Sequence, residues 1–423
     1  MTAEASTSSK PRPLKNAPAG RHPERLGPYQ IVEYLAAGGM ADLYLARCEG
    51  KPGFQVVKRI AEHYSGIGRI VELFIDEGRI AEQLRHPNIV RIFEAGSEPG
   101  PSGDQYYLAM EYIRGRDIVA IARRAAEVRR PIPRDLAIAL VVQVARGLCH
   151  AHEKLGDDGR PLRIVHCDIS PGNIVVSWGG TAKIVDFGIA RAEIQLRESN
   201  GSVAGKYNYM APEQIRGEAV DGRADVFSLG VILYELSLGR RLFRGRPEEV
   251  MHKVLEAPIA RPTEIDRDYD PELEAVVMRA LERDPERRWP SARALHDALS
   301  KVLWKRGKRV EKRALAAYMR EIFSSEKLQE AEDYTAPASD ATVSTTADPG
   351  PSGGIHLVDD DEPNDLPPPP TAKAAGPGHR TPASPEPTPP DQPSQPEERL
   401  ASSLAVILIG FASIVVLYFL LLR

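Results

Sequence analysis

Two stretches in the first quarter of the sequence carry residues that could act on a phosphorylated ligand. A glycine-rich turn lets backbone N–H groups approach phosphate oxygens closely, and Lys58 follows it in the apolar segment Val56-Val57-Lys58. Each feature alone has an ordinary explanation: the turn could be a plain hairpin, and the lysine could simply extend its amine to solvent. The turn and its edges consist of Leu35, Ala36, Ala37, Gly38, Gly39, Met40, Ala41, Asp42 and Leu43.

A second group of motifs lies further along the chain. Residues 166–173 are His-Cys-Asp-Ile-Ser-Pro-Gly-Asn, residues 186–188 are Asp-Phe-Gly and residues 211–213 are Ala-Pro-Glu; Glu77 precedes them, and Asp225 and Arg288 follow. A turn, a helix cap or a surface charge would explain any one of them. Their order and intervals together are highly specific.

In this combination the sequence resembles the eukaryotic-type (Hanks-type) protein kinase family, in its bacterial serine/threonine kinase branch. The resemblance covers about residues 29–303. It implies an α+β, bilobal protein kinase fold, with a small β-rich N-lobe, a larger helical C-lobe and ATP held between them.

The resemblance also implies roles for individual residues. Asp168 would be the catalytic base, Lys58 would hold the α- and β-phosphates, and Glu77 would hold Lys58. Asn173 and Asp186 would bind Mg²⁺, or Mn²⁺ in its place, through hard oxygen ligands. The remaining implied positions are the loop 35–43 over the phosphates, Leu43 and Val56 above adenine, Met110 as gatekeeper, Glu111 and Ile113 as hinge backbone, and Glu213 with Arg288 as a structural ion pair.

Four positions depart from the family pattern. Ala36 and Ala41 replace the outer glycines of the loop, and Gly205-Lys206 replaces the Gly-Thr that helps to mark serine/threonine specificity. Ser170 replaces the lysine that neutralises γ-phosphate charge. Cys167 replaces the arginine that grips a phosphorylated activation loop, so we expect activity without loop phosphorylation. We interpret Cys167 as a packed cysteine, because a neighbouring carboxylate disfavours its thiolate.

Apolar patterning predicts the elements that position these residues. Strands are expected at residues 31–35, 43–46, 54–60 and 106–112, and helices at 70–84, 136–154 and 226–238. A charged amphipathic helix is expected over 306–332, with Leu315, Tyr318, Met319, Ile322 and Phe323 on its apolar face.

Composition limits the remaining possibilities. The chain has 423 residues and a net charge of −4, which disfavours a nucleic-acid binder driven by bulk charge. Its three cysteines, Cys48, Cys149 and Cys167, exclude a disulfide scaffold and a cysteine-rich zinc site. The basic N-terminal stretch lacks the apolar core of an export signal.

The chain divides into five predicted segments. Residues 1–27 form a disordered arm, 28–303 the kinase domain and 304–332 a helical extension. Residues 333–399 form a disordered linker, because 16 prolines lie between Pro337 and Pro396 and Tyr334 is its one aromatic residue. Residues 400–423 form a transmembrane anchor, since 404–422 contain no charged residue and a bilayer needs about 20 apolar residues. A buried core helix is the weaker alternative.

The sequence therefore predicts a bacterial inner-membrane protein with a cytoplasmic kinase domain that phosphorylates Ser or Thr of proteins, including itself. One alternative is a pseudokinase that binds ATP and signals as a scaffold. Another is an interaction protein whose Pro-rich tail docks partner domains. Expected partners are protein substrates, a second copy in the membrane, and readers of phosphothreonine or proline motifs. We expect autophosphorylation mainly on linker threonines rather than on Ser199 or Ser202.

Overall fold

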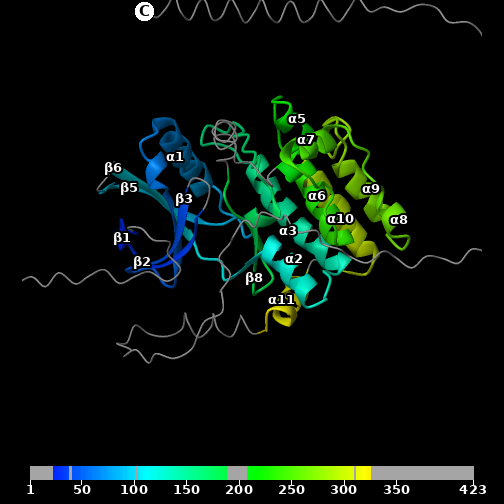
Figure 1. Cartoon of the computed structure of the whole chain (residues 1–423), viewed down its shortest axis with the longest axis horizontal. Coiled ribbons are helices and arrows are strands. Elements are labelled where there is room, and N and C mark those ends of the chain that lie inside the picture. Colours follow the sequence, from blue (N-terminus) through cyan, green and yellow to red (C-terminus); the bar gives the residue numbers. More distant parts are fainter. Residues whose placement is uncertain (1–21, 38–40, 101–102, 188–206, 309–310, 325–423) are drawn as a thin grey trace, which may run out of the picture. The chain divides into compact units, whose positions relative to one another are not determined.

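The computed structural model describes residues 22–37, 41–100, 103–187, 207–308 and 311–324. Its first part contains a six-stranded antiparallel sheet with the order β1-β2-β3-β4-β6-β5. The strands are β1 (Arg25–Leu26), β2 (Tyr29–Ala37), β3 (Ala41–Cys48), β4 (Gln55–Ile60), β5 (Ile92–Gly100) and β6 (Gly103–Glu111). Figure 1 shows these strands gathered with helix α1 (Gly68–Glu82).

The two-residue period of β4 decides which way its side chains point. Ile60 packs in the cluster that also contains Ile70 and Phe74 of α1. Val57 belongs to the opposite cluster, which is rich in tyrosines. Lys58 lies an even number of residues from Ile60, so the alternation places Lys58 on the face that α1 covers.

The second part of the domain is mainly helical. Its helices are α2 (Ile118–Glu127), α3 (Arg134–His152), α5 (Pro212–Ile215), α6 (Arg223–Leu238), α7 (Pro247–Leu255), α8 (Pro262–Ile265), α9 (Pro271–Ala280) and α10 (Ala292–Lys305). A small antiparallel sheet accompanies them, with strands β7 (Gly115–Asp117), β8 (Ile174–Ser177) and β9 (Ala182–Ile184) in that order. The expected β-rich and helical lobes are thus confirmed.

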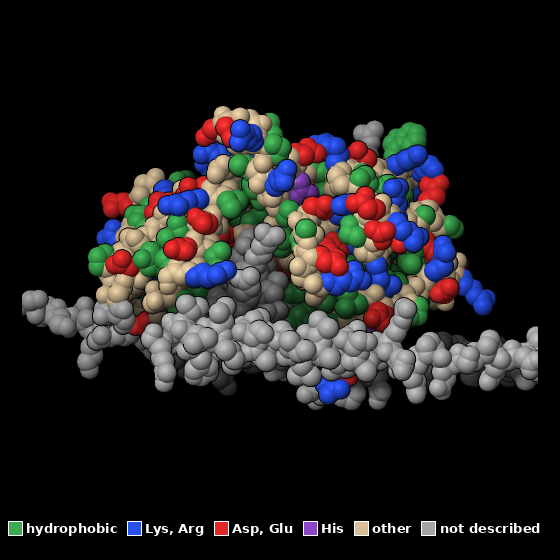
Figure 2. All heavy atoms as spheres, turned by 90° about the horizontal axis from the view of Figure 1, so that it is seen from above, with side chains coloured by type: hydrophobic (Ala, Val, Ile, Leu, Met, Phe, Trp, Pro, Cys, Tyr) green, Lys and Arg blue, Asp and Glu red, His purple; other side chains and the backbone are tan. Residues whose placement is uncertain are grey.

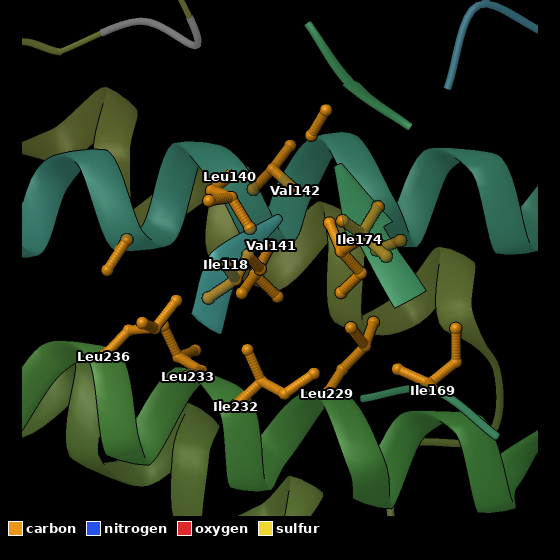
Figure 3. Close-up of a cluster of buried hydrophobic side chains, with 14 of the residues drawn as sticks. Ile118, Leu140, Val141, Val142, Ile169, Ile174, Leu229, Ile232, Leu233 and Leu236 are labelled. Atoms are coloured by element: carbon orange, nitrogen blue, oxygen red, sulfur yellow. The ribbon is translucent and has the colours of Figure 1, made fainter. Parts of the chain in front are cut away.

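Helices α3 and α6 form the centre of the helical lobe. Helix α6 is apolar around most of its circumference, as expected for a helix buried on all sides. Figure 3 shows Val141 of α3 facing Leu229 and Ile232 of α6. This rigid pair supports the loop between α3 and β8 that carries residues 166–173.

The amphipathic helix expected over 306–332 begins later than predicted. Gly307 takes the left-handed conformation (φ 67°), and the N–H of Lys308 bonds to the carbonyl of Leu303 at 2.9 Å, which ends α10. Helix α11 (Lys312–Ile322) then contacts α2 and α3. The expected apolar residues are all buried, and residues 325–332 lie outside the described residues.

Two further segment predictions can be compared with the structure. Arg25–Leu26 pairs with β2, so the interpretation of residues 1–27 as a disordered arm is wrong for its last residues. Within the described ranges, no helix is both long and apolar enough to cross a bilayer. The predicted anchor at 404–422 lies outside those ranges and stays a prediction.

Candidate active site

A lysine amine joins the two lobes. Lys58 Nζ lies 3.6 Å from Glu77 Oε1 of α1 and 3.0 Å from Asp186 Oδ1, which follows β9. Lys58 and Glu77 are both buried, and a buried amine requires such partners because an isolated buried charge is very costly. The structure therefore brings Lys58 and Glu77 together, and Asp186 joins them.

Asp168 and Asn173 are connected within one loop. The Asn173 side chain donates from Nδ2 to the Asp168 carbonyl at 2.8 Å and to its Oδ2 at 3.0 Å. The N–H of Val185 donates to the Asn173 carbonyl at 3.0 Å, which brings the residue before Asp186 against this loop. The three residues that the resemblance assigns to catalysis and metal binding therefore lie on adjoining backbone segments.

The donor set fits a hard divalent cation. Asn173 uses its amide nitrogen to hold Asp168, so its side-chain oxygen is oriented as an acceptor. Asp186 adds a carboxylate whose side chain is 37% exposed, and its backbone is left-handed (φ 58°). Carboxylate and amide oxygens are ligands that Mg²⁺ and Mn²⁺ accept.

A fully buried carboxylate on α6 holds the loop that carries Asp168. Asp225 of α6 accepts the backbone N–H groups of His166 and Cys167, each at 2.9 Å, and lies 2.8 Å from His152 Nε2. Burial alone would raise the pKa of Asp225, but the hydrogen bonds from His152 and the backbone lower it overall. Asp225 therefore holds the loop as a carboxylate.

The peptide group between Cys167 and Asp168 is held at both ends. Gln214 Nε2 donates to the Cys167 carbonyl at 2.8 Å, and the Asp168 N–H donates to His166 Nδ1 at 3.2 Å. Cys167 has a left-handed backbone (φ 64°), which a non-glycine residue adopts only when its surroundings enforce it. Sequence reasoning missed Gln214, although it directly follows Ala-Pro-Glu.

The predicted adenine-side residues lie on neighbouring strands. Leu43 of β3 is opposite Lys58, and Val56 of β4 is opposite Met110 of β6. The Glu111 side chain, at the end of β6, accepts from Lys183 Nζ at 2.6 Å, a contact that sequence reasoning also missed. Ile113 follows β6.

The glycine-rich turn is only partly described. Gly38, Gly39 and Met40 lie outside the described residues, whereas Leu35, Ala36 and Ala37 end β2 and Ala41 begins β3. The carboxylate of Asp42 pairs with Arg59 Nη2 at 3.0 Å, so this side chain supports the strands beside the turn.

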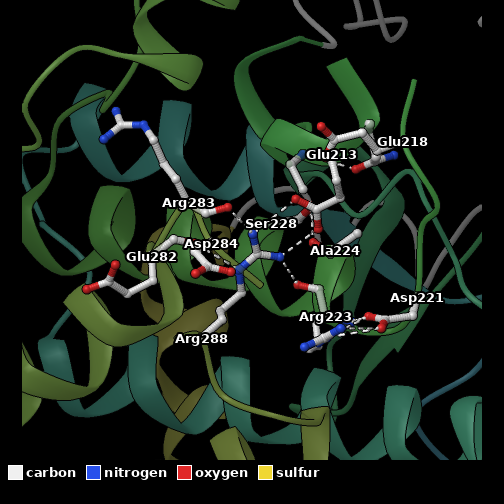
Figure 4. Close-up of polar contacts among 12 residues, drawn as sticks. Glu213, Glu218, Asp221, Arg223, Ala224, Ser228, Glu282, Arg283, Asp284 and Arg288 are labelled. Carbon is white, nitrogen blue, oxygen red and sulfur yellow. Dashed lines mark hydrogen bonds and ion pairs between the residues drawn. The ribbon is translucent and has the colours of Figure 1, made fainter. Parts of the chain in front are cut away.

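The predicted structural ion pair is present in the helical lobe (Figure 4). Arg288 donates to both carboxylate oxygens of Glu213, at 2.7 and 3.1 Å, and also to the Arg223 carbonyl at 2.6 Å. Both side chains are buried, and the fork-to-fork geometry is the strongest form of such a pair. It fixes α5, which carries Gln214.

Comparison with known proteins agrees with this geometry. The lobes and the Lys58–Glu77–Asp186 contact define a phosphotransferase domain of the protein kinase type, and the family model described as "Protein kinase domain" matches residues 29–300. The chain belongs to the protein kinase family, among the bacterial eukaryotic-type kinases.

Individual relatives differ in the specificity that their names state. The chain is 41% identical over 309 residues to "Tyrosine-protein kinase MasK" of Myxococcus xanthus, covering 72% of this chain and 47% of that protein. It is 33% identical over 281 residues to "Serine/threonine-protein kinase PknB" of Mycolicibacterium smegmatis, covering 65% of this chain and 43% of that protein. The chain thus spans about half the length of these curated relatives.

A solved structure matches the same part of the chain. The crystal structure of the PknI kinase domain of Mycobacterium tuberculosis aligns with a TM-score of 0.50 and 26% identity, covering 66% of this chain and 96% of that one.

Proposed function

We propose that this protein is an active kinase that transfers the γ-phosphoryl group of ATP to Ser or Thr hydroxyls of proteins, including its own. The observation that carries this proposal is the Lys58 amine held between Glu77 and Asp186. Phosphoryl transfer in protein kinases requires the ion pair between this lysine and the helix glutamate, with the aspartate nearby to hold the metal, and the contact supports both requirements.

Each site residue has a proposed part in the reaction. Lys58 binds the α- and β-phosphates as a point charge, and Glu77 orients it. Asn173 and Asp186 hold Mg²⁺, or Mn²⁺ in its place, which when bound neutralises charge on the phosphate oxygens. Asp168, steadied by the Asn173 amide, accepts the proton of the incoming hydroxyl.

A tyrosine specificity is the second candidate. It is favoured by the name of the Myxococcus xanthus relative and by Gly205-Lys206 in place of the Gly-Thr that helps to mark serine/threonine specificity. The relatives named as serine/threonine kinases favour the first candidate.

Labelling with radioactive ATP and Mg²⁺, followed by phosphoamino-acid analysis, tests both. We expect phosphoserine and phosphothreonine in the wild type, and a loss of label of at least about a hundredfold in Asp168→Asn. Asp104→Asn is the matched control, because its exposed carboxylate lies at the start of β6. Equal label in wild type and Asp168→Asn would refute the catalytic assignment, and a wild type that binds ATP without labelling would indicate a pseudokinase scaffold. Phosphotyrosine alone would establish the second candidate.

We also propose that residues 404–422 anchor the chain in the inner membrane, with the kinase domain in the cytoplasm and the 333–399 linker as the main autophosphorylation region. The support is the absence of charge in 404–422 and the threonines of the linker. Ile409→Arg with Val415→Arg should move the chain out of the membrane fraction of cells, whereas Ser402→Arg should not.

Phosphosite mapping tests the proposal for the linker. Phosphates confined to Ser199 and Ser202 would refute the linker as the main autophosphorylation region.

A further inference from the structure

A tryptophan lies exposed near the end of α10. The side chain of Trp304 is 74% exposed, whereas Trp178 is 8% exposed and Trp289 is partly buried against the helical core. An indole ring is large and apolar with one polar N–H, which suits the boundary between water and an apolar phase. Most of the apolar area of this ring is in contact with water, so covering it with another apolar surface would be favourable.

Basic residues lie close to this tryptophan in the sequence, on both sides of it. Lys301 lies one helical turn before it, so the two share a helix face. Lys308 follows the turn in which the N–H of Gly307 bonds to the Trp304 carbonyl at 2.9 Å. Lys312 and Arg313 begin α11. Between residues 301 and 313 the sequence has seven Lys or Arg residues and one acidic residue, Glu311.

Most of this charge is not neutralised by the domain itself. Lys305 pairs with Glu272, and Arg306 pairs with Asp135 and Asp270. Lys301, Lys308, Lys312 and Arg313 are exposed and form no ion pair with any other part of the chain that the structure describes. The face shown in Figure 2 mixes basic and acidic side chains. We call Lys301, Trp304, Lys308, Lys312 and Arg313 the Trp304 patch.

We propose that the Trp304 patch binds the surface of a bilayer that contains anionic lipids. Four free cations complement anionic headgroups, and the indole suits the headgroup boundary, where tryptophan is enriched. A nucleic acid is a poorer fit, because the patch offers one aromatic ring and the whole chain carries a net charge of −4.

This inference depends neither on catalysis nor on the predicted anchor, because none of the patch residues belongs to the active site or to 404–422. An anchored chain would nevertheless favour it. A linker the length of 333–399 has a root-mean-square span of about 45 Å if flexible, so the domain would stay within reach of the bilayer at high effective concentration.

Quenching of tryptophan fluorescence by lipids brominated on their acyl chains tests the proposal with the full chain. The probes are vesicles of brominated phosphatidylcholine, with or without phosphatidylglycerol. Such quenching requires contact between the indole and the bilayer, so it reports on Trp304 whether or not 404–422 inserts. We expect strong quenching only with phosphatidylglycerol, and its loss in Trp304→Phe but not in Trp178→Phe or Trp289→Phe.

Charge variants complete the test. We expect no quenching in a triple variant that combines Lys308→Glu, Lys312→Glu and Arg313→Glu. The matched control, Arg85→Glu with Arg240→Glu and Arg267→Glu, reverses three exposed cations elsewhere and should retain it. Equal quenching with and without phosphatidylglycerol, or none with it, would overturn the proposal. A blue shift of Trp304 that rises with protein concentration and without vesicles would instead identify a second copy as the partner.

Discussion

The side-chain amide of Gln214 donates a hydrogen bond to the backbone carbonyl of Cys167 at 2.8 Å. Gln214 also accepts the Ala211 N–H at 3.0 Å, so one side chain joins the start of α5 to the loop that carries Asp168. Cys167 stands where the family has an arginine that grips a phosphorylated loop. Gln214 holds the loop that carries Asp168 through a contact that needs no phosphate.

Gln214→Glu isolates this contact. The glutamate can still accept the Ala211 N–H but places a second acceptor against the Cys167 carbonyl. We expect kcat to fall about tenfold, which corresponds to about 1.4 kcal/mol, with little change in KM for ATP. Steady-state kinetics with a peptide substrate measure both constants. Gln83→Glu, on the exposed side of the end of α1, is the control, and an unchanged kcat for Gln214→Glu would exclude a positioning role.

Lys58→Met should abolish autophosphorylation while leaving the fold intact. The substitution removes the charge that holds the phosphates but keeps an apolar stem of similar length on the α1 side of β4. Radioactive labelling gives the activity and circular dichroism gives the fold. Lys154→Met, at a position remote from β4 in the sequence, should label like the wild type. Retention of label in Lys58→Met would be evidence against the kinase assignment.

Ser170→Lys should change the rate by less than about tenfold. The Ser170 carbonyl already accepts the Asn173 N–H at 3.0 Å, and its side chain is only partly buried, so a lysine can be placed there without repacking. Single-turnover phosphorylation measures the rate. An inert wild type that gains activity only with this lysine would support the scaffold alternative instead.

Acid should destabilise the domain through His86. Burial, with the charges of His150 and Arg146, lowers the pKa of His86 to about 4. An unfolded histidine titrates near pH 6.5, so the unfolded state takes up a proton first as the pH falls. The stability that the neutral His86 provides is therefore complete above about pH 6.5 and is lost as the pH falls towards 4.

His86→Asn separates this effect from others. Asparagine can still accept the Asn88 N–H, which His86 Nδ1 accepts at 3.1 Å, but it does not titrate. Urea unfolding at pH 7.5 and pH 5 should show a smaller loss of unfolding free energy in this variant than in the wild type. His252→Asn, at an exposed histidine, should behave like the wild type. The same loss in all three proteins would contradict the prediction.

Helix α11 should contribute to the stability of the kinase domain. Met319 is fully buried in the helical core, so Met319→Ala should lower the unfolding free energy by about 2–4 kcal/mol and Tm by several degrees. Arg320→Ala changes the exposed neighbour and should have little effect. Calorimetry measures both. Equal Tm values would show that α11 is not part of the cooperative unit.

The site residues could be predicted because the resemblance rests on motifs whose order and spacing are read directly from the sequence. The structure then explains their positions: Lys58 faces α1 because β4 alternates, and Glu77 lies on the buried side of an amphipathic helix. Strand β5 was missed because Gly, Pro and Glu weaken its pattern, and its residues are mostly half-buried. The Gln214–Cys167 contact joins residues 47 positions apart, which no local pattern reveals.

The packing of α11 has a mechanical consequence. Arg124 of α2 donates to the Ile322 carbonyl at 2.9 Å, and Phe323 lies against Trp178, which follows β8, with ring centroids 5.6 Å apart. Tension applied to the chain beyond residue 324 would therefore be borne first by the end of α11. The load would pass to α2, which directly follows β7, and to the turn between β8 and β9. Gly180 in this turn lies six residues before Asp186. Pulling on the chain after α11 would thus load the helical lobe through α2 and through the β8–β9 turn, which lies close to Asp186 in the sequence.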